Sequence, residues 1–530
     1  MKHRWAAGAV IGSVAVLAAA VPGSADPEND LRRSFVLRQA VTTDAVYARV
    51  RQFDRIGRAN GNTRVAGKAG YDSSARYVFN VLRRAGYTPV YQEFQFQAFE
   101  AFSSSLAQTA PAARTFTVGT EYTVAINSAS TPTGPVSGTV QAVDVNLNQP
   151  GGASTSGCEA TDFAGFAAGN VALVQRGTCG FIDKVRNAEA AGAVAVVIFN
   201  QGNTPDREGI FEPSLSTVDT NEPYTGALPV VFVPYAEGRT FATTPGTTLS
   251  IEVDAFRGQR TTRNVIAETA EGRADNVVML GAHLDSVPAG PGVNDNATGS
   301  AAILEVAVQL NRARVKARTP INNKVRFAWW SAEESGLIGS DYYIANLSAA
   351  QRADIALYLN FDMIGSPNFM RGIYDADTPG SAVAPPGSDQ IEAVFRDYFD
   401  SRGLPSVGTD FSGRSDYGPF IATGVDIPAG GLFTGAEGVK TPEEAALFGG
   451  TAGLPYDPCY HLACDTIANV NKTVLGGNAN AIAHATATFA RNTFLVNGEG
   501  EDEDAGPEIE LQAVRKAPVM LDRRGPYFIR

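Results

Sequence analysis

Residues 277–330 read VVMLGAHLDSVPAGPGVNDNATGSAAILEVAVQLNRARVKARTPINNKVRFAWW. The apolar run Val277–Ala282 predicts a buried strand, and the apolar residues of Thr298–Ala313 recur at helical spacing. Lys324–Trp330 predicts the next strand. A strand, a helix and a second strand in this order are typical of a parallel sheet that is covered by helices.

The same alternation continues toward residue 495. Ile355–Phe361 and Val425–Leu432 predict two further strands, whereas Ser388–Ser401 and Ile467–Leu495 predict helices. We therefore expect an α/β fold, in which a mixed, mainly parallel sheet is flanked by helices.

The part of the chain before this region changes character twice. Residues 44–85 show helical spacing around a glycine-rich loop, and Val90–Phe102 alternates as a strand does. From about residue 115 to residue 256, short Val- and Thr-rich runs alternate with Gly, Pro, Ser and Asn turns. One clear helix is expected there, over Ile182–Ala191, so this part predicts a smaller β-rich domain.

These patterns divide the chain into five segments. We expect a signal peptide at 1–25, the N-terminal part of the catalytic domain at 26–114, the β-rich insert at 115–256, the main part of the catalytic domain at 257–498, and an acidic linker with a C-terminal tail at 499–530. A basic start, an apolar run over 5–21 and small residues at 23 and 25 are typical of a signal peptide. Since that run is shorter than the ~20 residues of a membrane span, we expect a secreted protein with no membrane anchor after cleavage. An uncleaved N-terminal anchor is the alternative.

Charge and cysteine content limit the class of protein further. The formal net charge of -12 argues against nucleic acid as a partner, because phosphate binding needs a basic surface. An even number of cysteines in an exported chain predicts two disulfides. The nearest neighbours would pair Cys158 with Cys179 and Cys459 with Cys464, although sequence alone does not determine the pairing. A structural zinc site is the rival interpretation, but the spacings do not resemble a zinc finger.

Five short motifs carry the candidate chemistry, and they contain His283 with Asp285, Asp295, Glu333 with Glu334, Asp362, and His461. Three of the motifs directly follow predicted strands, and open α/β sheets form their sites beyond the carboxyl ends of strands. Each motif alone has a structural explanation, such as a helix cap or an acid that stabilises a helix dipole. Together, two histidines and several carboxylates form the nitrogen and oxygen ligand set that suits zinc.

Amide hydrolysis gives each of these residue types a role. Two metal ions ~3.5–4 Å apart can hold a water molecule and polarise a carbonyl, and Asp295 could bridge them. The Glu333-Glu334 pair could divide into a general base and a ligand. Asp285 suits the orientation of the His283 imidazole, and Tyr460 could donate a hydrogen bond to the oxyanion.

The motifs GAHLDS (281–286), GVNDNATG (292–299), SAEESGLIGS (331–340), NFDMIG (360–365) and CYHLACD (459–465) resemble those of the secreted bacterial di-zinc aminopeptidases. This family of clan MH metallopeptidases also contains glutamate carboxypeptidase and transferrin receptor. The resemblance spans roughly residues 263–495 and, more loosely, residues 44–100. It implies two zinc ions per chain and the release of N-terminal, hydrophobic amino acids from peptides.

Carried over by position, the resemblance assigns a role to each candidate residue. It implies that His283 and Asp362 hold one zinc ion, that Glu334 and His461 hold the other, that Asp295 bridges them, and that Glu333 is the general base. It also implies a Cys459–Cys464 disulfide. Arg414 and Phe433 match family positions near the substrate. A calcium site stays open, and we expect a monomer.

The insert resembles a protease-associated domain through NVALVQRGTCGF (170–181) and residues 184–200. Such domains carry no chemistry and are thought to shape substrate access.

Two other functions compete with the aminopeptidase. A carboxypeptidase of the same superfamily would need a basic pocket for the C-terminal carboxylate of its substrate, and Arg414 is the single basic residue that the sequence places near the site. A non-catalytic binding relative would lack zinc ligands, whereas every ligand position is filled here. A small-molecule amidase or a relative of glutaminyl cyclase is also conceivable.

Overall fold

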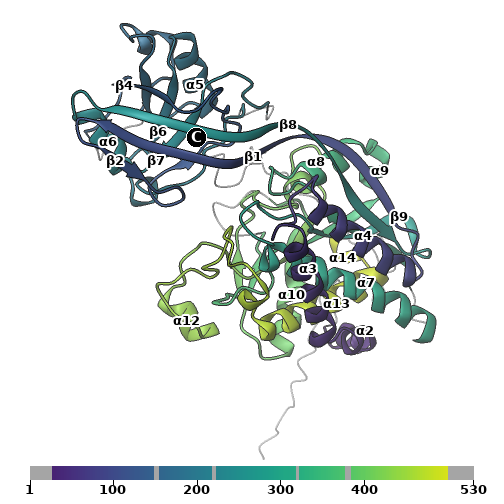
Figure 1. Cartoon of the computed structure of the whole chain (residues 1–530). Helices are drawn as coiled ribbons and strands as arrows, with labels where there is room; N and C mark the ends of the chain where they lie inside the picture. The colour runs from purple at the N-terminus through teal and green to yellow at the C-terminus, as the bar shows by residue number, and fades with distance from the viewer. Residues whose placement is uncertain (1–26, 149–153, 218–221, 318–320, 377–383, 499–530) are drawn as a thin grey trace, which may run out of the picture.

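The computed structural model describes residues 27–148, 154–217, 222–317, 321–376 and 384–498 (Figure 1). The predicted signal peptide and the acidic tail lie outside the described residues. Within the described ranges, no helix has both the length and the apolar character needed to cross a membrane.

The predicted α/β sheet is confirmed. Its central strands are parallel neighbours in the order β14 (Ala429–Phe433), β11 (Ile355–Phe361), β9 (Arg273–His283) and β10 (Asn323–Trp330). β12 (Gly372–Tyr374) pairs with β14 and β8 (Thr248–Glu268) pairs with β10, both in antiparallel orientation, which makes the sheet mixed. β13 (Val407–Thr409) completes the edge next to β12.

Helices cover both faces of this sheet because its strands are apolar on both sides. Val278 and Leu280 of β9 pack into a core with α3 (Thr43–Ala59), α4 (Ala69–Arg84), α7 (Thr298–Ala317), α10 (Ser388–Ser401) and α13 (Lys472–Arg491). The intervening Met279 points into a second core with α8 (Ile338–Ala345) and α11 (Gly418–Ile421). This alternation is the one expected of a strand that is buried on both faces.

A long antiparallel ribbon connects the α/β domain to a second lobe (Figure 1). It consists of β1 (Val90–Ala110) and β8, which pair along most of their length. The predicted strand Val90–Phe102 is therefore shorter than the strand in the structure. Both strands run through the α/β sheet and the insert, so the ribbon belongs to both lobes.

The insert contains more helix and more parallel sheet than its composition predicts. β4 (Val136–Ala142), β5 (Val171–Gln175), β6 (Ala195–Phe199) and β7 (Val230–Val233) are parallel, and α5 (Phe181–Ala190) confirms the expected helix. A second helix, α6 (Tyr235–Thr243), is not predicted from the sequence. Its glycine and threonines favour helix weakly, but Phe241 is buried and Gly238 lies against Phe199, so tertiary packing decides.

Two other boundaries differ from those predicted. β14 begins at Ala429 instead of Val425, because Asp426 has a left-handed backbone (φ 52°) and Pro428 lacks an N–H for the ladder. The helix predicted over 467–495 begins at Lys472, because the Asn471 side chain accepts from Thr473 N and Val474 N and caps it.

The remaining elements are short: α1 (Pro27–Arg33), α2 (Phe35–Ala40), β2 (Arg114–Phe116), β3 (Thr123–Val124), α9 (Ala349–Ala353), α12 (Pro442–Phe448) and α14 (Phe494–Asn497).

Candidate active site

The carboxyl ends of three neighbouring strands bring the candidate residues to one edge of the sheet. His283 is the last residue of β9, Asp362 directly follows β11, and Glu333 and Glu334 lie in the turn after β10. Asp295 lies in the segment that leads into α7. Since the three strands are parallel and adjacent, their ends meet, as expected for an open α/β sheet.

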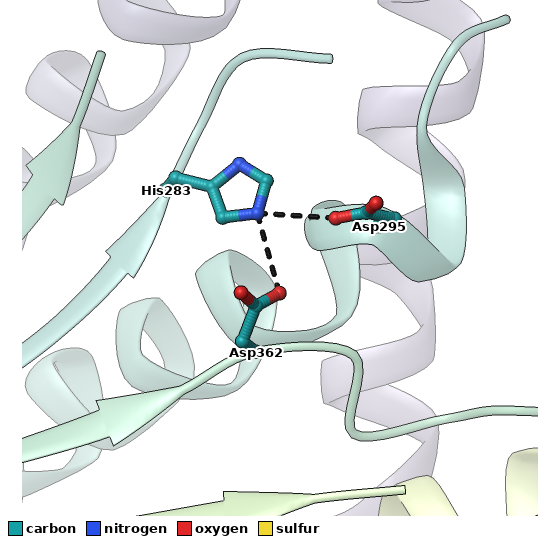
Figure 2. A group of neighbouring side chains, drawn as sticks. All are labelled: His283, Asp295 and Asp362. Atoms are coloured by element: carbon teal, nitrogen blue, oxygen red, sulfur yellow. Dashed lines mark hydrogen bonds and ion pairs between the residues drawn. The ribbon is translucent and has the colours of Figure 1, made fainter. Parts of the chain in front are cut away.

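His283 forms the first ligand group with two aspartates, as Figure 2 shows. Its Nε2 lies 3.1 Å from Asp295 Oδ1 and 3.2 Å from Asp362 Oδ1. The imidazole is 1% exposed, and each aspartate is less than 10% exposed. The three side chains thus converge on one buried point.

His461 forms the second group with the same Asp295. Its Nε2 lies 3.2 Å from Asp295 Oδ2 and 3.0 Å from Glu334 Oε2. The two carboxylate oxygens of Asp295 therefore face the two histidines separately, and the two groups share this one residue. Such an arrangement can hold two cations with a bridging carboxylate between them.

Glu333 forms a third group of possible ligand atoms with His283 and Glu334, but it lies farther from His283 than Asp295 and Asp362 do. Its Oε2 is 4.0 Å from His283 Nε2. Burial raises the pKa of Glu333 well above its ordinary value; the charge of His283 opposes the rise, whereas Glu334 adds to it. A carboxylate in such an environment is suited to accept a proton.

The acidic surroundings also act on His283 and Asp295. Burial alone would lower the pKa of His283, but the charges of Asp362 and Glu333 outweigh it and raise that pKa well above its ordinary value. Burial alone would raise the pKa of Asp295, whereas hydrogen bonds to His283 and His461 lower it. Several buried carboxylates at close range are stabilised either by protons or by cations that balance their charge.

Asp285 lies beside His283 and also contacts the turn after β10. Its Oδ1 is 3.7 Å from His283 Nδ1, which is too long for a hydrogen bond. Its two oxygens instead accept from Glu333 N and Glu334 N, each at 3.3 Å. Asp285 therefore anchors the backbone of the Glu333–Glu334 turn.

Three contacts that position the candidate ligands are not predicted from the sequence. Ser415 Oγ donates to Asp362 Oδ2 at 2.6 Å. Asp465 accepts from Asn294 N at 2.8 Å and from Asp295 N at 3.0 Å, so it fixes the backbone of the shared ligand. The one signal for Asp465 in the sequence is its place directly after the cysteine loop.

Arg64 supports the site from a distant part of the sequence. Its side chain is fully buried and donates to the main-chain carbonyls of Leu284, Pro291 and Gly292. Its backbone N–H donates to Ser286 Oγ at 2.9 Å. The loop between His283 and Asp295 is therefore built around this guanidinium.

Both disulfides predicted from sequence proximity are present. Cys158 pairs with Cys179 in the insert, and Cys459 pairs with Cys464 around His461. His461 has a left-handed backbone (φ 56°), a conformation that residues other than glycine seldom adopt. The short loop closed by the disulfide contains this residue.

A pocket of about 320 Å³ opens onto the two ligand groups. Its lining combines the candidate ligands Asp295, Glu334, Asp362 and His461 with Glu333, Arg414 and Tyr460, and with the largely apolar side chains of Met363, Met370, Tyr374, Phe433 and Tyr456. The Tyr460 ring stacks on the His461 ring, with centroids 3.9 Å apart. Arg414 and Phe433 thus line the same pocket as the candidate ligands.

Comparisons with known proteins agree with this architecture. The model for peptidase family M28 matches residues 264–486, and the PA domain model matches residues 136–241. An aminopeptidase of Pseudomonas aeruginosa is 44% identical over 496 residues, which are 93% of this chain and 89% of that protein. Leucine aminopeptidase 2 of Trichophyton equinum is 40% identical over 435 residues, 81% of this chain and 80% of that protein.

Solved structures share the fold. An aminopeptidase from Aneurinibacillus sp. strain AM-1 superposes with a TM-score of 0.65 at 23% identity, covering 90% of this chain and 98% of that chain. A zinc aminopeptidase from Bacillus subtilis gives a TM-score of 0.58 at 24% identity, covering 84% of this chain and 94% of that chain. With its strand-end site, its inserted lobe and relatives that match nearly its whole length, the chain belongs to peptidase family M28 and carries an inserted PA domain.

Proposed function

We propose that this aminopeptidase of family M28 binds two zinc ions and releases N-terminal, hydrophobic amino acids from peptides. His283 and Asp362 would hold one ion, Glu334 and His461 the other, and Asp295 would bridge them. The observation that carries the proposal is the pair of ligand groups that share Asp295, one oxygen facing each histidine.

The spacing of the donor atoms fits zinc. Ligand atoms about 2.0–2.1 Å from a tetrahedral zinc ion lie roughly 3.3 Å apart. The nitrogen-to-oxygen distances within the two groups are 3.0 to 3.2 Å. In addition, Glu334 Oε1 is buried without a hydrogen-bond partner, which leaves an oxygen available to a cation.

Residues of the chain would carry out the proton transfers and the stabilisation of the oxyanion. Bound zinc would supply a Lewis acid and a water molecule of lowered pKa. Glu333 takes the proton of the attacking water and transfers it to the leaving amine. Tyr460 donates a hydrogen bond to the carbonyl oxygen as negative charge develops there. The carboxylates around the site attract the free ammonium group of the substrate.

The pocket lining supports a preference for apolar N-terminal residues. Met363, Met370, Tyr374 and Phe433 present mainly carbon surface beside the candidate ligands. An apolar side chain gains free energy when such a wall removes it from water. The leucine aminopeptidases among the relatives support the same preference.

The organisation of the chain completes the proposal. Residues 26–114 and 257–498 form the catalytic domain, residues 115–256 form the PA insert, and the protein is secreted after removal of residues 1–25. The two disulfides favour an oxidising compartment.

Hydrolysis of leucine p-nitroanilide, compared with its N-acetylated form, tests the proposal. We expect cleavage of the free-amine substrate alone, loss of cleavage after chelation, and recovery with two equivalents of zinc. Cleavage that requires a free C-terminus would instead establish a carboxypeptidase. A zinc-loaded protein that cleaves neither substrates with a free N-terminus nor substrates with a free C-terminus would be a non-catalytic binding relative.

A further inference from the structure

Arg414 contacts two side chains of the site region. Its Nη1 donates to Glu437 Oε1 at 2.8 Å, and its Nη2 donates to Tyr460 OH at 3.3 Å. A guanidinium takes part in hydrogen bonds only as a donor, and it keeps its positive charge at any pH that proteins tolerate. Arg414 therefore links the acidic side chain of Glu437 to the hydroxyl of Tyr460, a residue that lines the pocket.

This link determines the direction in which Tyr460 can donate. A phenol hydroxyl has one proton and accepts through its oxygen lone pairs. Because Arg414 occupies an accepting position of the Tyr460 oxygen, the proton of Tyr460 must point toward another acceptor. A nearby cation also polarises the hydroxyl and makes it a stronger donor.

Glu437 keeps Arg414 in this place. The ion pair orients the guanidinium fork, and it balances the positive charge beside the proposed cations. Burial alone would lower the pKa of Arg414, but its contacts with Tyr460 and Glu437 outweigh burial and raise that pKa. With both partners engaged, the guanidinium has fewer donors available for a substrate carboxylate.

We propose that Arg414 is a positioning residue that acts through Tyr460, directing the phenol proton of Tyr460 at the carbonyl oxygen of the scissile bond, and that Glu437 holds Arg414 for this purpose. This inference rests on the proposed aminopeptidase function. It differs from the family resemblance, which places Arg414 at the substrate.

The two roles affect different kinetic constants. A substrate-binding arginine contributes to ground-state binding, so its loss raises KM and is independent of the Tyr460 hydroxyl. A residue that acts through Tyr460 strengthens a bond made in the transition state, so its loss lowers kcat and has an effect only while the hydroxyl is present.

A double-mutant cycle on the zinc-loaded protein separates these roles, with leucine p-nitroanilide as substrate. We expect Tyr460→Phe to lower kcat by about 100-fold, as the loss of one oxyanion donor does. Arg414→Met should lower kcat roughly 10-fold with KM within about 2-fold, and should have less than about a 2-fold further effect in the Tyr460→Phe background. Glu437→Gln should cause a smaller loss of kcat that also disappears in that background.

The conservative variant and the zinc content complete the design. Arg414→Lys keeps the charge but loses the fork, so its kcat should fall between those of wild type and Arg414→Met. Zinc content and Tm should match wild type in every variant, which shows that the proteins are folded and loaded. Equal losses from Arg414→Met in both backgrounds, or a loss confined to KM, would overturn the inference alone. A wild-type protein that leaves the free-amine substrate intact would overturn the proposed function and this inference together.

Discussion

At the residue scale, the adjacent residues Glu333 and Glu334 have different surroundings. Glu334 Oε2 lies 3.0 Å from His461 Nε2, within a ligand group, whereas Glu333 Oε2 lies 4.0 Å from the nearest histidine nitrogen. Asp285 accepts from the backbone N–H of both residues and so fixes the turn that separates their side chains. Adjacent carboxylates can thereby serve as ligand and as base.

Replacement of Glu333 tests this division. Glu333→Ala should lower kcat by at least about 1000-fold and keep two zinc ions per chain, because the base is not a ligand. Glu334→Ala is the matched control and should lose zinc as well as activity. The measurement is zinc per chain by atomic absorption beside turnover of leucine p-nitroanilide. Parallel loss of zinc and turnover in Glu333→Ala would contradict the division of roles.

His484 has a structural role at the same scale. It is 3% exposed, its Nδ1 lies 2.8 Å from Ser34 Oγ, and its ring stacks on Tyr398. Burial, helped by the charge of Arg38, lowers the pKa of His484 to about 3. The folded protein therefore keeps this imidazole neutral at pH values where the unfolded chain protonates it.

The sign of the pH effect follows directly. Between pH 6.5 and pH 3 the unfolded state binds more protons, so the free energy of unfolding falls as the pH falls, by about 1.4 kcal/mol per unit. Between pH 7 and pH 5, the free energy of unfolding should fall by about 2 kcal/mol less in His484→Gln than in wild type. Urea denaturation at both pH values measures this, with Ser34→Ala as a control that keeps the imidazole. An unchanged pH dependence in His484→Gln would show that His484 does not contribute.

At the scale of elements, the loop between β9 and α7 joins two candidate ligands, because it follows His283 and contains Asp295. Arg64, from the segment between α3 and α4, satisfies three of its carbonyls. Burial lowers the pKa of Arg64 to about 10, opposed first by the charge of Asp285, so the side chain stays charged at neutral pH. The loop is thus organised by a residue more than 200 positions away in the sequence.

Removal of this guanidinium should affect both folding and metal binding. Arg64→Met should cost about 3 kcal/mol of stability, because it leaves buried carbonyls without donors, and should weaken zinc binding at least about 10-fold. Competition with a chromophoric chelator measures the affinity, and urea denaturation measures the stability. Arg58→Met removes a largely exposed arginine that pairs with Asp54 and should cost less than about 1 kcal/mol. Unchanged zinc affinity in Arg64→Met would refute this role.

At the scale of the whole molecule, one ribbon connects the two lobes, and the insert contributes the acidic residue Glu212. The Glu212 side chain is exposed to solvent, yet the surrounding protein raises its pKa while the charge of His461 lowers it. A residue of the insert therefore lies within electrostatic range of a candidate ligand.

Neutralising this charge should alter selectivity among peptides. Glu212→Gln should lower kcat/KM for a Leu-Lys peptide relative to a Leu-Leu peptide by roughly 2- to 5-fold at low salt, since one screened charge contributes about 0.5–1 kcal/mol. The difference should vanish at 0.5 M salt, at about which the screening length falls to a few ångströms. Glu208→Gln, in the same loop, is the control. A salt-independent effect would indicate a structural change in place of an electrostatic one.

Apolar runs and short motifs in the sequence were enough to predict the class of fold and the candidate metal ligands. The apolar runs within β9, β10 and β11 predict parallel strands. His283, Glu333, Glu334 and Asp362 lie at or just after the ends of these strands, so parallel packing alone brings these four residues together, whereas Asp295 and His461 come from loops. Helix α6 and the start of β14 were not predictable, because their local propensities are weak and packing or backbone conformation decides them.

Other features depended on contacts between distant segments. The Arg64 carbonyl contacts, the Asp465 bonds to the backbone of Asp295, and the link from Arg414 to Tyr460 join residues that no periodicity relates. The same holds for the ribbon of β1 and β8, whose strands lie more than 100 residues apart. Hydrophobic periodicity in the sequence indicates which side of a helix or strand is buried. The hydrogen-bond partner of a buried polar group is determined only when the whole chain has folded, because that group must bond to whichever donor or acceptor the fold places beside it.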